Sequence, residues 1–200
     1  ARVGPKPAVV VATPGAEPVA EGGYGAALLL DSWALLGRQD LRAAEDTLRR
    51  WMAAAALVRS RADGGSVAVI AESAIPTVQS LIRWDPVGHA ESELNARAEV
   101  ALPPAVHLAV LDGVPEAVNA LLDFAELPPE AESLGPVDLP PGARRPPGIA
   151  VDSPLARMLV RVPRAGGLDL AAALRRAVNG LSARHDQQPV RVQMDPLHIG

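Results

Sequence analysis

The clearest structural signal in this chain is the sequence VHLAVLDGVPEAVNALLDFA, residues 106–125. Its apolar run Val106–Leu111 predicts a strand, and Asp112-Gly113 is typical of a turn. Apolar residues then recur at helical spacing over residues 114–125, and Pro115 falls in the first turn, where its missing N–H costs nothing. This stretch predicts a strand, a turn and a helix in succession.

The segments that follow continue the pattern. They predict strands at Leu134–Leu139, Arg157–Val162 and Val190–Met194, and a helix striped by Leu170, Leu174, Ala177, Val178 and Leu181. The Pro-, Gly- and Arg-rich segment Pro140–Pro154 is expected to be a mobile loop. The order β-α-β-β-α-β is that of the split, ferredoxin-like unit, an α+β fold.

In that fold both helices lie on one face of the sheet. Alternation in the strand 157–162 places Met158, Val160 and Val162 under the helices. The opposite, open face is then expected to carry the polar or long side chains Arg157, Leu159, Arg161, Arg191 and Gln193. Several arginines on an open sheet face favour contacts with a nucleic-acid backbone, although sheet faces that bind RNA usually add aromatic platforms, which this one lacks. A plain solvated surface is the alternative.

The first part of the chain has a different pattern. Continuous apolar runs predict buried strands at Pro7–Ala12, Gly25–Asp31 and Ser66–Ala71, and a helix runs from a cap at Asp40 through a stripe ending at Val58. These elements predict part of an α/β parallel sheet whose remainder is expected upstream of Ala1. Helical connectors follow over residues 75–84 and 86–101, and the helix breaker Leu102-Pro103-Pro104 marks the expected domain boundary.

Composition excludes several classes of protein. The 200 residues are 48% hydrophobic but only 2% aromatic, which predicts a core of Ala, Val and Leu, with Trp33, Trp51 and Trp84 packed inside or between domains. The absence of cysteine excludes a disulfide framework, a thiolate zinc site and cysteine catalysis in this chain. Four scattered histidines argue against a metal site. No apolar run approaches the ~20 residues of a membrane span, so we expect a soluble cytoplasmic protein.

Charge is unevenly distributed. The net charge is −4, and residues 104–141 contain seven acidic and no basic residues. Residues 142–194 contain nine arginines and no lysine against three acidic residues, a net charge of +6. Arginine suits the recognition of phosphate or carboxylate groups. The codon usage of a high-GC genome is the rival explanation for the missing lysines.

No catalytic site is predicted. Asp31 ends a strand, and Ser32, Asp85 and His89 match no known nucleophile arrangement. The glycine-bearing loops at residues 13–16 and 21–25 match neither of the phosphate-binding patterns GxGxxG and GxxxxGKS, and they are typical of turns.

Three motifs in order resemble the PriA family (primosomal protein N′), superfamily-2 helicases of bacterial replication restart. Glu93-Leu94-Asn95-Ala96-Arg97 followed by Leu102-Pro103-Pro104 resembles the junction between the family's helicase core and C-terminal domain. Leu134-Gly135-Pro136 and Asp195-Pro196 are similar to later family motifs. The resemblance implies residues 1–72 as the end of a RecA-like second helicase lobe, 73–104 as a helical connector and 105–200 as a ferredoxin-like C-terminal domain.

The sequence departs from the family at two helicase motifs. Ala12-Thr13-Pro14 and Ala20-Glu21-Gly22 stand where motif V has Gly-Thr-Gln and Lys-Gly, and residues 53–61 lack the Gly-Arg pairs of motif VI. Loss of arginines that stabilise a transferred phosphate lowers the rate by 10³-fold or more, an order-of-magnitude figure. The resemblance therefore implies a degenerate, actinobacterial-type helicase without catalysis, whose zinc and ATP sites lie upstream, so no cofactor is expected in this chain.

The resemblance further implies partners. They are branched or single-stranded DNA, the single-stranded-DNA-binding protein and the machinery that loads the replicative helicase. Phosphate contacts are expected first from Arg144 and Arg145, then from Arg157, Arg161 and Arg191; Arg175 and Arg176 are expected to hold the acidic tail of the single-stranded-DNA-binding protein. The alternatives are an active ATP-dependent helicase with atypical motifs and a protein-docking module without DNA contact.

Overall fold

A computed structural model describes residues 2–30, 32–38, 40–140, 142–183 and 188–197. The chain folds as two units, residues 1–93 and 94–200. The division between them falls inside a helix, ahead of the boundary expected at residues 102–104. The assignment of residues 1–72 to a helicase lobe stays a prediction.

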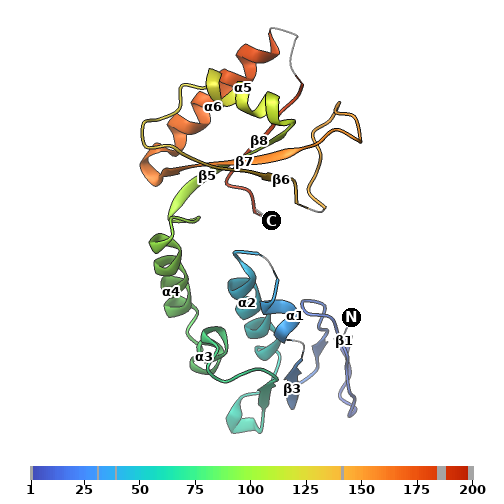
Figure 1. The fold of residues 1–200 in the computed structure, drawn as a ribbon. Helices are drawn as coiled ribbons and strands as arrows, with labels where there is room; N and C mark the ends of the chain where they lie inside the picture. Colours follow the sequence, from blue (N-terminus) through green and yellow to red (C-terminus); the bar gives the residue numbers. More distant parts are fainter. Residues whose placement is uncertain (1, 31, 39, 141, 184–187, 198–200) are drawn as a thin grey trace. The chain divides into compact units, whose positions relative to one another are not determined.

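The first unit is built from short strands and helices (Figure 1). Its elements are β1 (Arg2–Val3), β2 (Val19–Ala20), β3 (Ala26–Leu29), α1 (Ser32–Leu36), α2 (Ala43–Ala55), the 3-10 turn η1 (Arg61–Asp63), β4 (Ser66–Val69), α3 (Pro76–Arg83) and the start of α4 (Pro86–Glu99). β1 pairs with β2, and β3 with β4, both in parallel. The parallel pairing of residues 26–29 with 66–69 agrees with the predicted sheet.

A small core holds this unit together. Leu48 and Trp51 of α2 pack with Val78 and Leu81 of α3, and Leu29 and Val69 from the paired strands lie against them. Because apolar residues of α2 and α3 recur at helical spacing, each helix presents one apolar side to this cluster. The core therefore fixes two helices on one face of the β3–β4 pair.

Several predictions for this unit are wrong. Residues 7–12 form no strand and are exposed, with Val9 and Val11 at 94% and 95%. A valine run becomes a strand only where its backbone finds a ladder partner, and none of the described residues supplies one here. β3 and β4 are also not buried on both faces, since Leu28 is 68% exposed.

Two further predictions concern a helix cap and the tryptophans. Asp40 does not cap α2: its Oδ1 accepts a hydrogen bond from Arg42 N at 2.9 Å, and the helix begins one residue after Arg42. Trp51 lies in the core as expected, but Trp33 and Trp84 are 77% and 53% exposed. Asp31 lies outside the described residues.

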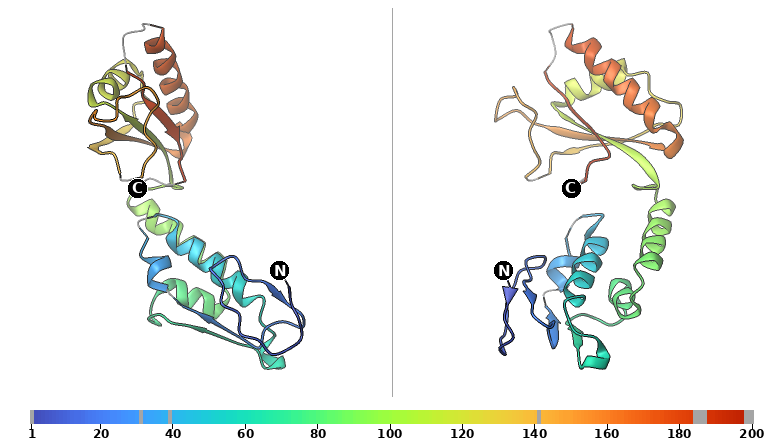
Figure 2. Two further views of the ribbon diagram at one scale, coloured as in Figure 1. Left: turned by 90° about the vertical axis from the view of Figure 1, so that its right-hand side faces the viewer. Right: turned by 180° about the vertical axis from the view of Figure 1, so that it is seen from behind.

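The second unit has the predicted element order β-α-β-β-α-β. After the end of α4 come β5 (Val106–Gly113), α5 (Pro115–Phe124), β6 (Glu132–Asp138), β7 (Ala156–Pro163), the 3-10 turn η2 (Arg164–Gly166), α6 (Gly167–Ser182) and β8 (Arg191–Met194). The sheet order is β6-β7-β5-β8, and all neighbouring strands are antiparallel. Pro115 occupies the start of α5 as predicted. Both helices lie on the same face of the sheet, as the views from the side and from behind show (Figure 2).

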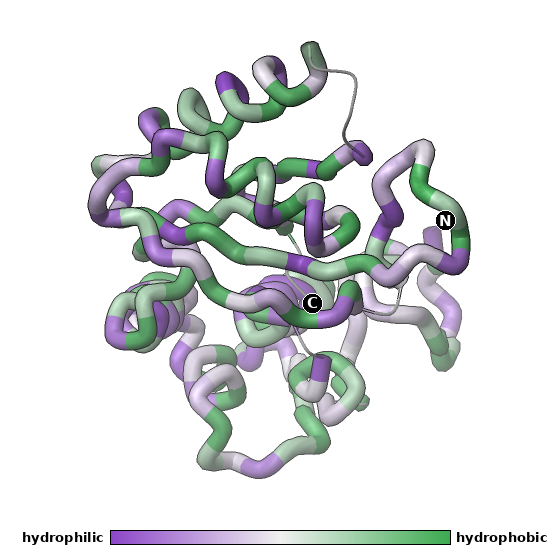
Figure 3. The backbone as a smooth tube through the Cα atoms, turned by 45° about the horizontal axis from the view of Figure 1, so that its top comes forward, coloured by the Kyte–Doolittle hydropathy of each residue, from purple (hydrophilic) through white to green (hydrophobic). Residues whose placement is uncertain are grey.

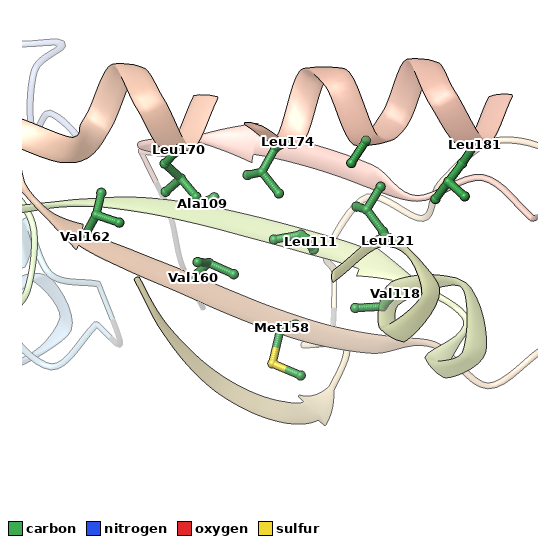
Figure 4. Packing of buried hydrophobic residues seen from close by; sticks show 11 residues of the cluster. Ala109, Leu111, Val118, Leu121, Met158, Val160, Val162, Leu170, Leu174 and Leu181 are labelled. Atoms are coloured by element: carbon green, nitrogen blue, oxygen red, sulfur yellow. The ribbon is translucent and has the colours of Figure 1, made fainter. Parts of the chain in front are cut away.

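The main core fills the space between this sheet and its helices (Figure 4). Met158, Val160 and Val162 point from β7 toward the helices, which confirms the predicted alternation. Leu170 and Leu174 point from α6 toward the sheet, near Ala109 and Leu111 (Figure 4). Apolar residues that face the core alternate along each helix with polar residues on its outer side, so the colour of the tube changes repeatedly between hydrophobic and hydrophilic (Figure 3).

The opposite face of the sheet is not bare. Leu108, Val110 and Asp112 of the central strand β5 are each no more than 2% exposed, although they alternate with the helix-facing Ala109 and Leu111. Asp112 and Gly113 belong to β5, so the predicted turn is wrong there. The strand continues because Asp112 finds charged partners on both neighbouring strands.

The segment 140–154 contains no helix or strand among its described residues, as predicted. Part of it packs: Ile149 lies against a cluster formed by Val114, Ala117 and Leu155. Its expected mobility is a prediction that the structure does not test.

Candidate nucleic-acid interface

Arg157 lies near the start of β7, on the sheet face that points away from the helices. β7 pairs with β5 so that Arg157 stands opposite Asp112. Its Nε and Nη2 donate to Asp112 Oδ1 and Oδ2 at 2.8 and 3.0 Å, and the two side chains are 7% and 1% exposed. A bidentate arginine–carboxylate pair is a strong, directional contact. The guanidinium predicted to bind phosphate is thus already occupied by a buried carboxylate.

Arg191 approaches the same carboxylate from the other side. β8 places Arg191 opposite Asp112, and its Nη1 lies 3.6 Å from Oδ2. Its side chain is 25% exposed, more than that of Arg157. One carboxylate therefore faces two guanidinium groups, and the group of three carries a net positive charge whose accessible part belongs to Arg191.

Arg161 joins three parts of the second unit. Its Nε and Nη2 contact Glu132 Oε2 of β6 at 2.8 and 2.7 Å. Its Nη1 donates to the carbonyls of Val100 and Ala101 at 3.2 and 3.1 Å. These carbonyls follow the last turn of α4, where a helix leaves acceptors unpaired and a cation is favourable. Arg161 thus anchors the end of a helix, and its side chain is only 23% exposed.

The loop contains the arginine that is most open to a ligand. Arg145 Nη2 donates to the carbonyls of Ala150 and Ser153 at 3.0 and 3.1 Å, so it braces the loop from within. Arg144 is exposed, and its guanidinium has no hydrogen bond or ion pair within the described part of the chain. The adjacent arginines therefore differ: one holds the loop and the other projects from it.

Arg175 and Arg176 lie together on α6, away from the core. The helix buries Leu170, Ala173, Leu174, Ala177 and Leu181. Both arginines are exposed, and neither forms an ion pair with the residues that the structure describes. They form a separate basic site on the helical layer, on the opposite side of the sheet from Arg157, Arg161 and Arg191.

The residues considered for catalysis are held in separate structural contacts. Ser32 Oγ donates to the Ile70 carbonyl at 2.5 Å, and Asp85 Oδ1 accepts from Gly88 N at 2.8 Å. His89 is buried, with Nδ1 3.5 Å from Ser80 Oγ. Across the described ranges, no three His, Cys, Asp or Glu side chains are grouped to hold a metal ion. None of the described helices is long and apolar enough to span a membrane.

Sequence reasoning missed the acidic partners of this face. The sequence pattern predicts a turn at Asp112 and gives Glu132 no role, yet both carboxylates accept hydrogen bonds from two of the predicted phosphate-binding arginines. A signal existed, because Leu108, Val110 and Asp112 continue one alternating row, and an acid at the end of a buried row requires a basic partner.

Comparisons with known proteins identify relatives over the whole chain. A family model described as the primosomal protein N C-terminal domain matches residues 98–197. The probable replication restart protein PriA of Mycobacterium leprae (strain TN) is 68% identical over 198 residues, which cover 99% of this chain and 30% of that protein. The probable replication restart protein PriA of Mycobacterium tuberculosis (strain CDC 1551 / Oshkosh) is 70% identical over 201 residues, covering 97% and 31%. The chain thus spans about 30% of the length of the curated relatives that it matches.

Proposed function

This chain belongs to the primosomal protein N C-terminal domain family of replication restart proteins, and from that membership we propose that it binds DNA and docks partners without catalysis of its own. The DNA is branched or single-stranded. The partners are the single-stranded-DNA-binding protein and the machinery that loads the replicative helicase. The protein acts in the cytoplasm, at the nucleoid.

One observation carries this proposal. The basic segment 142–194 contains nine arginines and no lysine, and three of them, Arg144, Arg175 and Arg176, are exposed without a partner among the described residues. Arginine forms strong hydrogen bonds with phosphate and carboxylate oxygens. Exposed arginines on two different surfaces support two acidic ligands, DNA on one and an acidic peptide on the other.

The contacts of each arginine rank the proposed DNA-binding residues. Arg144 comes first because nothing in the described chain competes for it. Arg191 and Arg161 follow, since 25% and 23% of their side chains are exposed. Arg157 and Arg145 rank last because their guanidinium groups are already bound within the chain, the first to Asp112 and the second to loop carbonyls.

We also propose that the second unit has the ferredoxin-like fold and that the first is the end of a RecA-like lobe. The sheet order β6-β7-β5-β8, with both helices on one face, supports the first assignment. The parallel β3–β4 pair supports the second. The zinc and ATP sites of the family are proposed to lie outside this chain.

The proposed lack of helicase activity rests on the departures from motifs V and VI. Arg59, which lies within the segment that corresponds to motif VI, donates through Nε to the Gly22 carbonyl at 2.9 Å and is thereby engaged within the chain. An active ATP-dependent helicase would require a replacement arginine finger and an intact P-loop. Measurement of ATP hydrolysis by the full-length protein on forked DNA separates these alternatives, and turnover above background would contradict the proposal.

The DNA-binding proposal is tested by fluorescence anisotropy of this chain with a labelled fork at two salt concentrations. Affinity is expected to fall steeply as salt rises, because each neutralised phosphate releases counterions. The variant Arg144→Ala is compared with a matched control, Arg49→Ala, which removes an arginine side chain that is 71% exposed on α2 of the first unit. No binding at low salt would leave the chain as a protein-docking module.

A further inference from the structure

Trp84 occupies an unusual backbone position at the corner between α3 and α4. Its φ and ψ are 56° and 41°, in the left-handed region. Its N–H donates to the Leu81 carbonyl at 3.1 Å, and Asp85 N–H donates to the Ser80 carbonyl at 2.9 Å. These two bonds form the Schellman motif, in which this position is usually glycine. A bulky side chain there strains the backbone.

Burial within the chain does not compensate for this strain. Trp84 is 53% exposed, and its neighbours Ile82 and Val87 are 67% and 65% exposed. Tryptophan is on average a largely buried residue. Since strained residues persist where function requires them, the contribution of this indole is to be sought in a ligand.

The corner is also held by contacts on both of its sides. α4 begins directly after it, where Gly88 N donates to Asp85 Oδ1 at 2.8 Å. α3 is held from its other side by Val78 and Leu81 in the core.

An arginine directly precedes this tryptophan in the chain. Arg83 is exposed at the end of α3, and its Nη2 donates to Gln79 Oε1 at 3.1 Å, which orients the guanidinium along the helix. An aromatic ring next to an arginine is the combination that proteins use to hold single strands without sequence preference, one stacking on a base and the other contacting a phosphate.

We propose that Trp84 is a stacking platform for an unpaired DNA base and that Arg83 binds the adjacent phosphate. The site belongs to the first unit, whereas the arginines described above belong to the second, and it rests on the proposed DNA-binding function. The exposed Ile82 and Val87 would also suit a protein partner, but the exposed arginine at the preceding position favours a single strand. The occupant is therefore single-stranded DNA.

The test uses the 200-residue chain and labelled oligo(dT), with Trp84→Ala, Trp84→Phe and the control Trp33→Ala, which removes the other exposed tryptophan. Trp84→Ala is expected to weaken binding about tenfold, while Trp84→Phe stays within about threefold because it keeps an aromatic face. Trp33→Ala is expected to bind as the wild type does. An oligonucleotide of abasic sites keeps the phosphates without bases, so Trp84→Ala and the wild type should bind it equally.

A further variant separates this role from a structural one. Trp84→Gly places the preferred residue in the left-handed position, so its Tm should equal or exceed that of the wild type while its oligo(dT) affinity falls as in Trp84→Ala. A lower Tm for Trp84→Gly would indicate a packing role and overturn the inference. Wild-type affinity in Trp84→Ala would overturn it too and leave the proposed function standing. Failure of the wild-type chain to bind any DNA would overturn both.

Discussion

Asp112 and Arg157 face each other across β5 and β7, 45 residues apart in sequence, and are joined by two hydrogen bonds of 2.8 and 3.0 Å in a site that is almost closed to water. The pair lies on the sheet face opposite the helices. It also sets the position of Arg191, whose Nη1 lies 3.6 Å from the same carboxylate.

Asp112→Asn should destabilise the second unit strongly. It leaves the buried guanidinium of Arg157 without its counter-charge, which costs about 3 to 5 kcal/mol in comparable buried pairs. Urea unfolding of the variant measures this loss. The control is Glu132→Gln, because Glu132 is 61% exposed and its pair with Arg161 contributes less than about 1 kcal/mol. Equal losses in the two variants would refute the special role of the buried pair.

Arg144→Ala and Arg145→Ala should weaken DNA binding in different ways. Removing Arg144 takes away one phosphate contact, so the slope of log affinity against log salt should fall by about one. Removing Arg145 frees the carbonyls of Ala150 and Ser153, so amide exchange of residues 143–153 should accelerate while the slope changes less. Salt-dependent anisotropy and hydrogen exchange together measure both. Unchanged exchange in Arg145→Ala, with the slope loss of Arg144→Ala, would contradict this assignment.

Arg175→Ala combined with Arg176→Ala should weaken binding of an acidic peptide that carries the tail of the single-stranded-DNA-binding protein. Two exposed ion contacts together account for roughly a three- to tenfold change in affinity. Isothermal titration calorimetry with the tail peptide checks this, with Arg49→Ala as the control. Unchanged affinity in the double variant would remove these residues from the proposed partner site.

Gly167→Ala should destabilise the start of α6. A Cβ there would overlap the ring of His107, which cannot easily move because its Nδ1 lies 2.6 Å from Asp195 Oδ2. Overpacking of this kind costs about 1 to 3 kcal/mol, more than alanine gains over glycine in a helix. The addition of His107→Ala should recover part of the loss in thermal unfolding. Gly25→Ala, which meets no atom within 4 Å, is the neutral control.

The element order of the second unit could be predicted because its hydropathy pattern is local and consistent. Apolar residues at helical spacing placed α5 and α6, and alternation in β7 correctly sent Met158 and Val160 toward the helices. The first unit was harder: the valine run at residues 7–12 has high strand propensity, but no described neighbour pairs with it.

For the candidate site too, some features could be predicted from the sequence and others could not. That residues 142–194 are basic follows from counting charges, and the placement of Arg157 and Arg161 on one face of β7 follows from the alternation of side chains along a strand. Their accessibility does not follow, because it depends on which acid the neighbouring strand places beside each guanidinium. The left-handed backbone conformation of Trp84 is also visible only in the structure, because no local sequence pattern predicts a tryptophan at a position where glycine is usual.

By itself the sequence determined the strand and helix order of residues 106–194, the apolar faces of α5, α6 and β7, and the excess of arginine in the last quarter of the chain. These are properties of neighbouring residues, and periodicity reports them directly. The tertiary structure alone decided which arginines bind Asp112, Glu132 and the carbonyls that follow α4, and which, like Arg144, remain accessible to a ligand. The reason is that strand register pairs residues far apart in the chain, and a charge is available to a ligand only where that pairing leaves it in water.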